Sequence, residues 1–199
     1  MLFISEHGIV DDERIKVRIF PNIEGRRMSK VNGIVVHQTG APTAGSTFNS
    51  YTNKGANGAH FLIDKDGTIY QTASLLRATN HVGLLQSRCL VKKQCSQAEF
   101  QSAYSLRNNP RPLSTHEVRK DFPERFPANA DSVGVELVGG ASGKRGDEKY
   151  ESVTDQQNAS LKWLVDRLIS ALGVSMQEIY RHPEIGRKNA TEASTAKWK

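Results

Sequence analysis

Two short apolar runs, each bounded by glycines, predict buried strands. One covers residues 33–40 and places His37 directly after three aliphatic residues. The other covers residues 132–140 and carries Glu136 in its middle. Unbroken aliphatic runs of this length, rich in β-branched residues, are typical of strands that are buried on both faces. The pattern therefore predicts a sheet whose central strands each carry one ionisable residue.

Further strands are indicated by alternation and by turn signals. Residues 14–20 alternate charged and apolar side chains, which predicts a strand with one exposed face. Residues 57–64 and 68–72 read as two strands of a hairpin, because the Asp-Gly dipeptide between them favours a tight turn. The segment 80–83 is either a short strand or a loop.

Helical periodicity is clearest after Thr154. The apolar positions from Leu161 to Leu172 recur every three or four residues, and Gly173 follows them. Thr154 and Gln157 form a capping box at the start of this helix. A shorter helix is predicted to begin at Ser46 or Thr47 and to stop at Gly55, and a short helix or turn is predicted at 175–179.

Residues 84–131 interrupt this regular pattern with prolines and many charges. We interpret them as an insertion or lid within a single domain that spans residues 1–199, because long irregular segments of compact domains are usually functional or mobile. Short helices are predicted inside the insertion at 100–106 and 115–119.

Two cysteines, Cys89 and Cys95, lie in this insertion. Their spacing is too wide for a CxxC redox motif, and no neighbouring histidine completes a local zinc knuckle. They are either a disulfide of an oxidising compartment or two thiols in a cytosolic loop. Their position in a polar loop, outside the apolar core segments, favours the disulfide.

The net positive charge indicates which classes of molecule the chain could bind. The net charge is +6 and the pI about 9.4, so nucleic acid, an anionic cell-wall polymer and acidic lipid are the candidate partners. Basic residues are spread along the chain without interleaved aromatics, which argues against nucleic acid. No apolar run approaches ~20 residues, so no transmembrane helix is expected. The start lacks the pattern of a secretory signal peptide, so action outside the cytoplasm would require another route.

Five scattered residues suggest a chemistry when they are taken together. Separately, each has an ordinary explanation as a core, turn or surface residue. Two neutral histidines and a carboxylate can hold Zn²⁺ with one position open to water. Zinc activates that water and polarises a carbonyl, a second carboxylate moves the proton, and a lysine stabilises the developing oxyanion. The residues that could fill these places are His37, Glu136, His182, Lys188 and Glu192.

The order of these motifs resembles the zinc-dependent N-acetylmuramoyl-L-alanine amidases, whose fold is shared by peptidoglycan recognition proteins and amidase-type phage lysozymes. Several ordered matches are far more specific than any one of them. The segments that carry the resemblance are residues 34–39, 58–71, 80–83, 132–139 and 182–188.

The resemblance implies an α/β fold, with a central mixed β-sheet flanked by helices and with 84–131 as a long insertion. It implies that His37 and His182 are zinc ligands, that Glu136 is the catalytic acid-base residue and that Lys188 stabilises the oxyanion. The family usually places an aspartate, cysteine or histidine shortly after the Arg-Lys pair. In this chain only Glu192 lies at a similar distance, so either Glu192 is the third ligand or that ligand is missing and zinc binds weakly.

Two further histidines match family positions that line the substrate groove or support a strand. His60 and His81 are therefore candidate substrate-binding residues, with His60 better explained by packing or by support of a ligand. The resemblance does not account for residues 84–131. We hypothesise that these residues form one side of the substrate groove and determine which muropeptide binds there.

The resemblance implies an enzyme with Zn²⁺ as cofactor and peptidoglycan or a muropeptide as substrate. It would cleave the amide bond between N-acetylmuramic acid and the L-alanine of the stem peptide. The compatible settings are recycling of wall fragments in the cytosol, phage-type lysis with lysis machinery, and injection into a rival's periplasm by a secretion system, which would also require a cognate immunity protein. The insertion, the cysteines and the basic charge favour a bacteriolytic enzyme or antibacterial effector that acts on the polymeric wall.

Two alternatives belong to other functional classes. A non-catalytic peptidoglycan-binding module of the same fold would result if the third zinc ligand were lost. A basic nucleic-acid-binding domain would bind duplex DNA with strong salt dependence, but nothing in the order of the motifs requires it.

Overall fold

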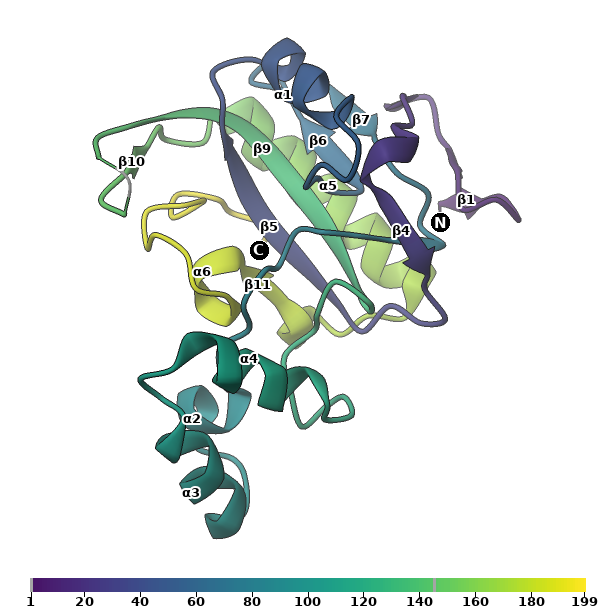
Figure 1. Ribbon diagram of the computed structural model, residues 1–199. Helices are drawn as coiled ribbons and strands as arrows, with labels where there is room; N and C mark the ends of the chain where they lie inside the picture. Colours follow the sequence, from purple (N-terminus) through teal and green to yellow (C-terminus); the bar gives the residue numbers. More distant parts are fainter. Residues whose placement is uncertain (1, 145) are drawn as a thin grey trace.

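A mixed sheet of seven strands forms the centre of the computed structural model, which describes residues 2–144 and 146–199 (Figure 1). Its four adjacent strands β11, β5, β9 and β6 are parallel. Strand β7 returns antiparallel to β6, β3 pairs with β7, and β10 pairs with the end of β9. In sheet order the strands are β11 (Ile179–Arg181), β5 (Gly33–Gly40), β9 (Ser132–Ser142), β6 (Phe61–Ile63), β7 (Ile69–Gln71) and β3 (Ile15–Val17), with β10 at Lys149–Tyr150.

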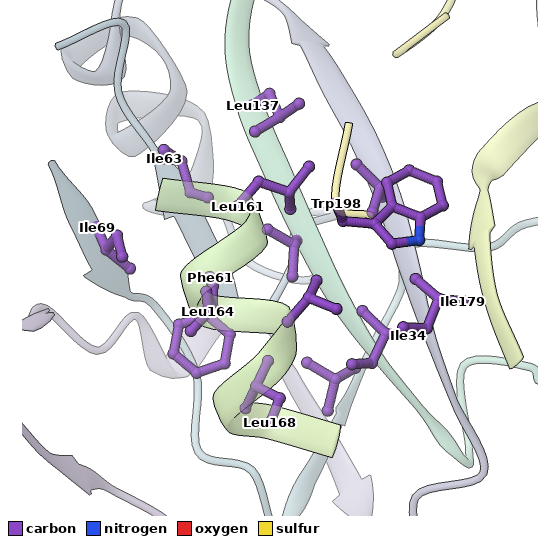
Figure 2. Packing of buried hydrophobic residues seen from close by; sticks show 14 of the residues in the cluster. Ile34, Phe61, Ile63, Ile69, Leu137, Leu161, Leu164, Leu168, Ile179 and Trp198 are labelled. Carbon is purple, nitrogen blue, oxygen red and sulfur yellow. The ribbon is translucent and has the colours of Figure 1, made fainter. Parts of the chain in front are cut away.

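The longest helix, α5 (Asp155–Leu172), covers one face of this sheet. Its apolar stripe packs on side chains from the central strands, among them Ile34, Phe61 and Leu137 (Figure 2). The capping box of Thr154 and Gln157 is present at its start, and Gly173 ends it with a φ of 67°. The helix predicted from the periodicity is therefore confirmed at both ends.

The other face of the sheet is also covered, which explains the unbroken apolar runs. Ile34 and Val36 face α5, whereas Val35 belongs to a second cluster with Val82 and Phe126. Helix α1 (Ala44–Tyr51) covers the same face farther along and packs on Leu62 and Val138. A four-residue helix, α6 (His182–Ile185), follows β11 directly.

Three helices within the predicted insertion form an arm beside β11 (Figure 1). They are α2 (Arg88–Lys92), α3 (Gln97–Ser105) and α4 (Pro110–Val118). Cys89 and Cys95 are joined by a disulfide across the α2–α3 connection, as the sequence favoured. Arg88 makes two contacts with Glu178, of 2.7 and 3.0 Å, which fasten the arm to the segment that precedes β11.

Several predicted boundaries are wrong by a few residues. Helix α1 begins at Ala44 because the capping side chain is that of Thr43, which accepts a hydrogen bond from the backbone N–H of Ser46. The helix ends at Tyr51, well before Gly55. The predicted strands at 14–20 and 57–64 are only three residues long. Helix α4 begins at Pro110, which suits the first helical position.

Small elements complete the described part of the chain. Residues 80–83 form a loop. The short antiparallel pairs are β1 (Phe3–Ile4) with β2 (Val10–Asp11) and β4 (Glu24–Arg27) with β8 (Arg77–Thr79). None of the helices described is long and apolar enough to cross a membrane.

Candidate active site

The register of the sheet brings the predicted site residues together. His37 on β5 is the direct partner of Glu136 on the parallel strand β9. On the other side of β5, Arg181 pairs with Val36, so His182 follows level with His37. Because the carboxyl ends of parallel strands meet at one edge of a sheet, three segments far apart in sequence deliver their ionisable side chains to one place.

Three ligand atoms converge at this edge. The Nδ1 atoms of His37 and His182 are 2.9 Å apart, and Glu192 Oε1 lies 3.1 Å from His182 Nδ1 and 3.4 Å from His37 Nδ1. Tetrahedral zinc with bonds of ~2.0–2.1 Å requires ligand atoms roughly 3.3 Å apart. The three side chains therefore have the chemistry and the spacing of a zinc site.

The burial of Glu192 supports the presence of a cation at this point. The residue is 2% exposed. Its Oε2 atom has no hydrogen-bond partner within the described residues, and Lys188 Nζ lies 3.9 Å away. A buried carboxylate oxygen without a donor is costly unless a positive charge compensates it. The residues at this position fit a divalent metal ion.

Hydrogen bonds on the side away from the cluster orient the imidazole rings of His182 and His37. His182 Nε2 lies 2.7 Å from the carbonyl oxygen of Val82, which can only accept, so that nitrogen carries the proton. This leaves the lone pair of Nδ1 directed to the cluster. His37 Nε2 lies 3.0 Å from His81 Nδ1, and His81 Nε2 lies 3.3 Å from the carbonyl oxygen of Ser132. A consistent set of tautomers has His37 donate to His81 and His81 donate to Ser132.

The electrostatics favour the protonation states that a metal requires. Burial lowers the pKa of His37 to about 4, and the neighbouring His182 contributes in the same direction, so this imidazole is neutral at physiological pH. Burial alone would raise the pKa of Glu192, but its close contacts with the His182 and His37 side chains outweigh burial and hold that pKa far below its ordinary value. A neutral imidazole and an ionised carboxylate are metal-binding forms.

Glu136 lies in a different environment. Its side chain is partly exposed, and Tyr51 at the end of α1 donates a hydrogen bond of 2.5 Å to its Oε2 atom. Burial raises the pKa of Glu136 above its ordinary value, and the Tyr51 hydrogen bond opposes that rise. A carboxylate with a raised pKa is suited to accept a proton and to return it.

The sequence pattern did not indicate a role for Tyr51 in the site. It lies on the apolar side of α1 with Phe48, where an aromatic residue is ordinarily explained by packing. A hydroxyl on a buried aromatic ring requires a partner, and that requirement was the only available signal.

A polar cleft of about 360 Å³ surrounds these groups. It is lined by the three candidate ligands and by His81, Glu136 and Lys188. The Lys188 side chain is about half exposed. A neighbouring pocket of about 380 Å³ beside α1 shares Thr39, Asn57 and Glu136 with the cleft, so Glu136 lies between the two.

The two remaining histidines lie in different places. His81 lines the cleft and contacts His37. His60 is completely buried and does not line the cleft. Its Nδ1 accepts from the backbone N–H of Gly134 at 3.0 Å and its Nε2 donates to the carbonyl oxygen of Arg77 at 2.8 Å. The structure therefore gives His60 a packing role that ties β8 to β9.

A second group with metal-ligand chemistry lies in the arm. Glu99, His116 and Glu117 lie close enough together to bind an ion. The ammonium group of Lys120, however, pairs with both glutamates, at 2.6 Å from Glu117 Oε1. The lysine already supplies the positive charge, so this group is an ion-pair network that joins α3 to α4.

The fold is similar to that of several solved proteins. AmpD is 17% identical over 94% of this chain and 89% of its own, with a TM-score of 0.56. PlyL is 15% identical over 87% and 84%, with a TM-score of 0.54. AmpDh3 from Pseudomonas aeruginosa, solved with anhydromuramic pentapeptide, is 18% identical over 94% of this chain and 60% of its own, with a TM-score of 0.54. These likenesses confirm the predicted mixed-sheet fold.

Sequence comparison identifies the family. No curated protein matches the chain. The model of a protein family, described as N-acetylmuramoyl-L-alanine amidase, matches residues 27–196, which include every candidate site residue. Together with the fold, this match shows that the chain belongs to the N-acetylmuramoyl-L-alanine amidase family.

Proposed function

We propose that this chain is a zinc-dependent hydrolase that cleaves the amide bond between N-acetylmuramic acid and the L-alanine of the peptidoglycan stem. The observation that carries the proposal is the convergence of His37, His182 and Glu192 beside Glu136, within one cleft of an amidase-family chain. When bound to these three side chains, zinc would activate water and polarise the scissile carbonyl.

The chain's own residues divide the remaining work. Tyr51 holds Oε2 of Glu136, and no hydrogen bond within the described residues occupies Oε1, which is therefore available to accept a proton from the attacking water. Glu136 then returns that proton to the leaving amine of L-alanine. Lys188, on the rim of the same cleft, supplies positive charge to the oxyanion that develops on the carbonyl.

We extend the proposal to a bacteriolytic or antibacterial role on the polymeric wall. The disulfide of the arm suits an oxidising compartment such as the periplasm. The net charge of +6 suits an anionic polymer as substrate. In that setting the chain would act with lysis or secretion machinery, and a producing cell would need a cognate immunity protein.

Digestion of purified sacculi followed by mass spectrometry of the soluble products tests the reaction. The wild-type protein should release free stem peptides that begin with L-alanine. Removal of metal with a chelator should abolish release and added Zn²⁺ should restore it, and Glu136→Gln should be inactive while it keeps its circular-dichroism spectrum. Release that survives both chelation and Glu136→Gln, or binding to sacculi without any release, would overturn the proposal.

A further inference from the structure

A second groove continues from the catalytic cleft toward the helical arm. Its volume is about 790 Å³. Leu90, Arg107 and Leu113 line it from the arm, and Arg187 and Lys188 line it from the loop after α6. Lys188 also lines the catalytic cleft, so the groove and the cleft are adjacent at this residue.

The charge of the groove is positive. Three of the described lining residues, Arg107, Arg187 and Lys188, are basic, and one, Glu148, is acidic. Glu148 already accepts a hydrogen bond from the Asn189 side chain at 3.2 Å. Within the described residues neither arginine forms an ion pair with an acidic side chain. Both guanidinium groups are therefore available to an anionic ligand.

Apolar side chains accompany these charges. Leu85 and Leu113 are 1% and 7% exposed, and Val91 on α2 is 47% exposed. Guanidinium groups bind carboxylates with paired hydrogen bonds, and a half-exposed aliphatic side chain such as Val91 can pack against short alkyl groups of a ligand. Stem peptides of peptidoglycan carry both free carboxylates and alanine methyl groups, so their chemistry complements this groove.

The arm is held in place before any ligand arrives. Arg88 on α2 is paired with Glu178 at 2.7 Å, and the disulfide closes the connection to α3. The guanidinium of Arg107 lies 3.9 Å from the centre of the Tyr104 ring and donates to the Tyr104 carbonyl oxygen at 2.9 Å. A binding surface that is already ordered loses less entropy when it binds.

We propose that this groove is a peptide subsite, in which Arg107 and Arg187 bind carboxylates of a stem peptide of the substrate polymer. The inference rests on the proposed amidase function. It adds to that function a preference for peptidoglycan whose stem peptides carry free, non-amidated carboxylates. It assigns the helical arm a specific task, the recognition of substrate charge away from the scissile bond.

Two soluble muropeptides that differ only in amidation of the stem carboxylates test the subsite. The wild-type enzyme should show a lower KM for the free-carboxylate form. Arg107→Gln and Arg187→Gln should each raise that KM by about 3- to 10-fold with kcat retained, as expected for the loss of one charge-assisted hydrogen bond. KM for the amidated form should stay nearly constant. Arg111→Gln, on the exposed start of α4 outside the groove, is the matched control.

Calorimetric binding of the same muropeptides to Glu136→Gln protein separates the subsite from the reaction. The arginine substitutions, made in this background, should weaken binding of the free-carboxylate form selectively, and about 0.5 M salt should reduce the difference. Equal affinity for both muropeptides, or equal losses on both, overturns the subsite. If the wild-type enzyme releases no stem peptide, the proposed function fails, while the calorimetric preference still decides the subsite.

Discussion

Two glutamates of one cleft are held in opposite electrostatic states. Glu192 lies against two imidazoles, and these close contacts outweigh burial and keep the pKa of Glu192 low. Glu136 has a single tyrosine donor, so burial dominates and its pKa is raised. Pairs of titratable groups whose environments move their pKa values apart are typical of a division of roles. At the scale of the residue, the difference supports the proposed roles of Glu192 in metal binding and of Glu136 in proton transfer.

The Tyr51 hydrogen bond gives a pH-dependent prediction. Glu136 must be ionised to accept a proton, so activity should fall as the pH drops through its pKa. Tyr51→Phe removes the donor that opposes the effect of burial, and the pKa of Glu136 should therefore rise further. The acidic limb of the kcat–pH profile should move to higher pH, and kcat should drop by about 10-fold. An unchanged acidic limb would show that Tyr51 does not act through Glu136.

Substitution of Glu192 tests the third ligand. Glu192→Gln keeps the size of the side chain but removes the anionic oxygen, so Zn²⁺ affinity should fall by more than about 100-fold, the upper range for loss of a residue that only supports a ligand. Competition with a chromogenic chelator measures this affinity directly. Glu124→Gln, which changes an exposed glutamate outside the cleft, should bind zinc like the wild type. Equal affinities of the two variants would exclude Glu192 as a ligand.

At the scale of the element, neighbouring residues of strand β5 divide between core packing and the candidate site. Val36 packs toward α5, while the next residue, His37, points to the opposite face and reaches the cleft. This division follows from the two-residue period of a strand. The packing of α5 on the other face of the sheet thereby supports strand β5, which carries His37 (Figure 2).

The contribution of α5 packing to the free energy of unfolding can be measured. Leu164 is completely buried against the sheet, so Leu164→Ala should lower the free energy of unfolding by about 2–5 kcal/mol through lost burial and a cavity. Urea denaturation measures the change. Lys162→Ala, on the exposed side of the same helix, should change it by less than about 0.5 kcal/mol. Similar effects of the two substitutions would contradict the assigned faces of α5.

At the scale of the whole molecule, three cavities lie next to one another and share lining residues. The pocket beside α1 meets the central cleft at Glu136, and the cleft meets the arm groove at Lys188. The scissile bond would thus lie between a polar pocket and a basic groove. An arrangement with surfaces on both sides of the reacting groups suits a polymeric substrate better than a small one.

The stability of the whole fold should depend on a histidine outside the cleft. Burial lowers the pKa of His60 to about 4, from 6.5 for an ordinary histidine. Between these values the unfolded chain binds a proton that the folded chain does not, so stability falls as the pH drops from about 6.5 to 4. The loss reaches ~3 kcal/mol for this residue.

Urea midpoints measured at pH 7 and 4.5 test the effect of His60. The wild type should lose more stability over this interval than His60→Gln, which cannot titrate. His7→Ala, which changes an exposed histidine, should behave like the wild type. Equal pH dependence of His60→Gln and the wild type would show that His60 does not contribute.

The amino-acid sequence alone predicted the local elements and supplied the candidate ligands. The apolar runs defined the two strands that carry His37 and Glu136, and the spacing of leucines defined α5, because both signals lie in residues that are close together along the chain. Tertiary structure alone decided the rest. Strand register placed Glu136 beside His37, and a loop folded Glu192 back onto His182. Helix α1 brought Tyr51 to Glu136, and the arm placed Arg107 in the groove beside Lys188. Each of these contacts joins segments whose proximity depends on packing of the whole chain, which no local periodicity encodes.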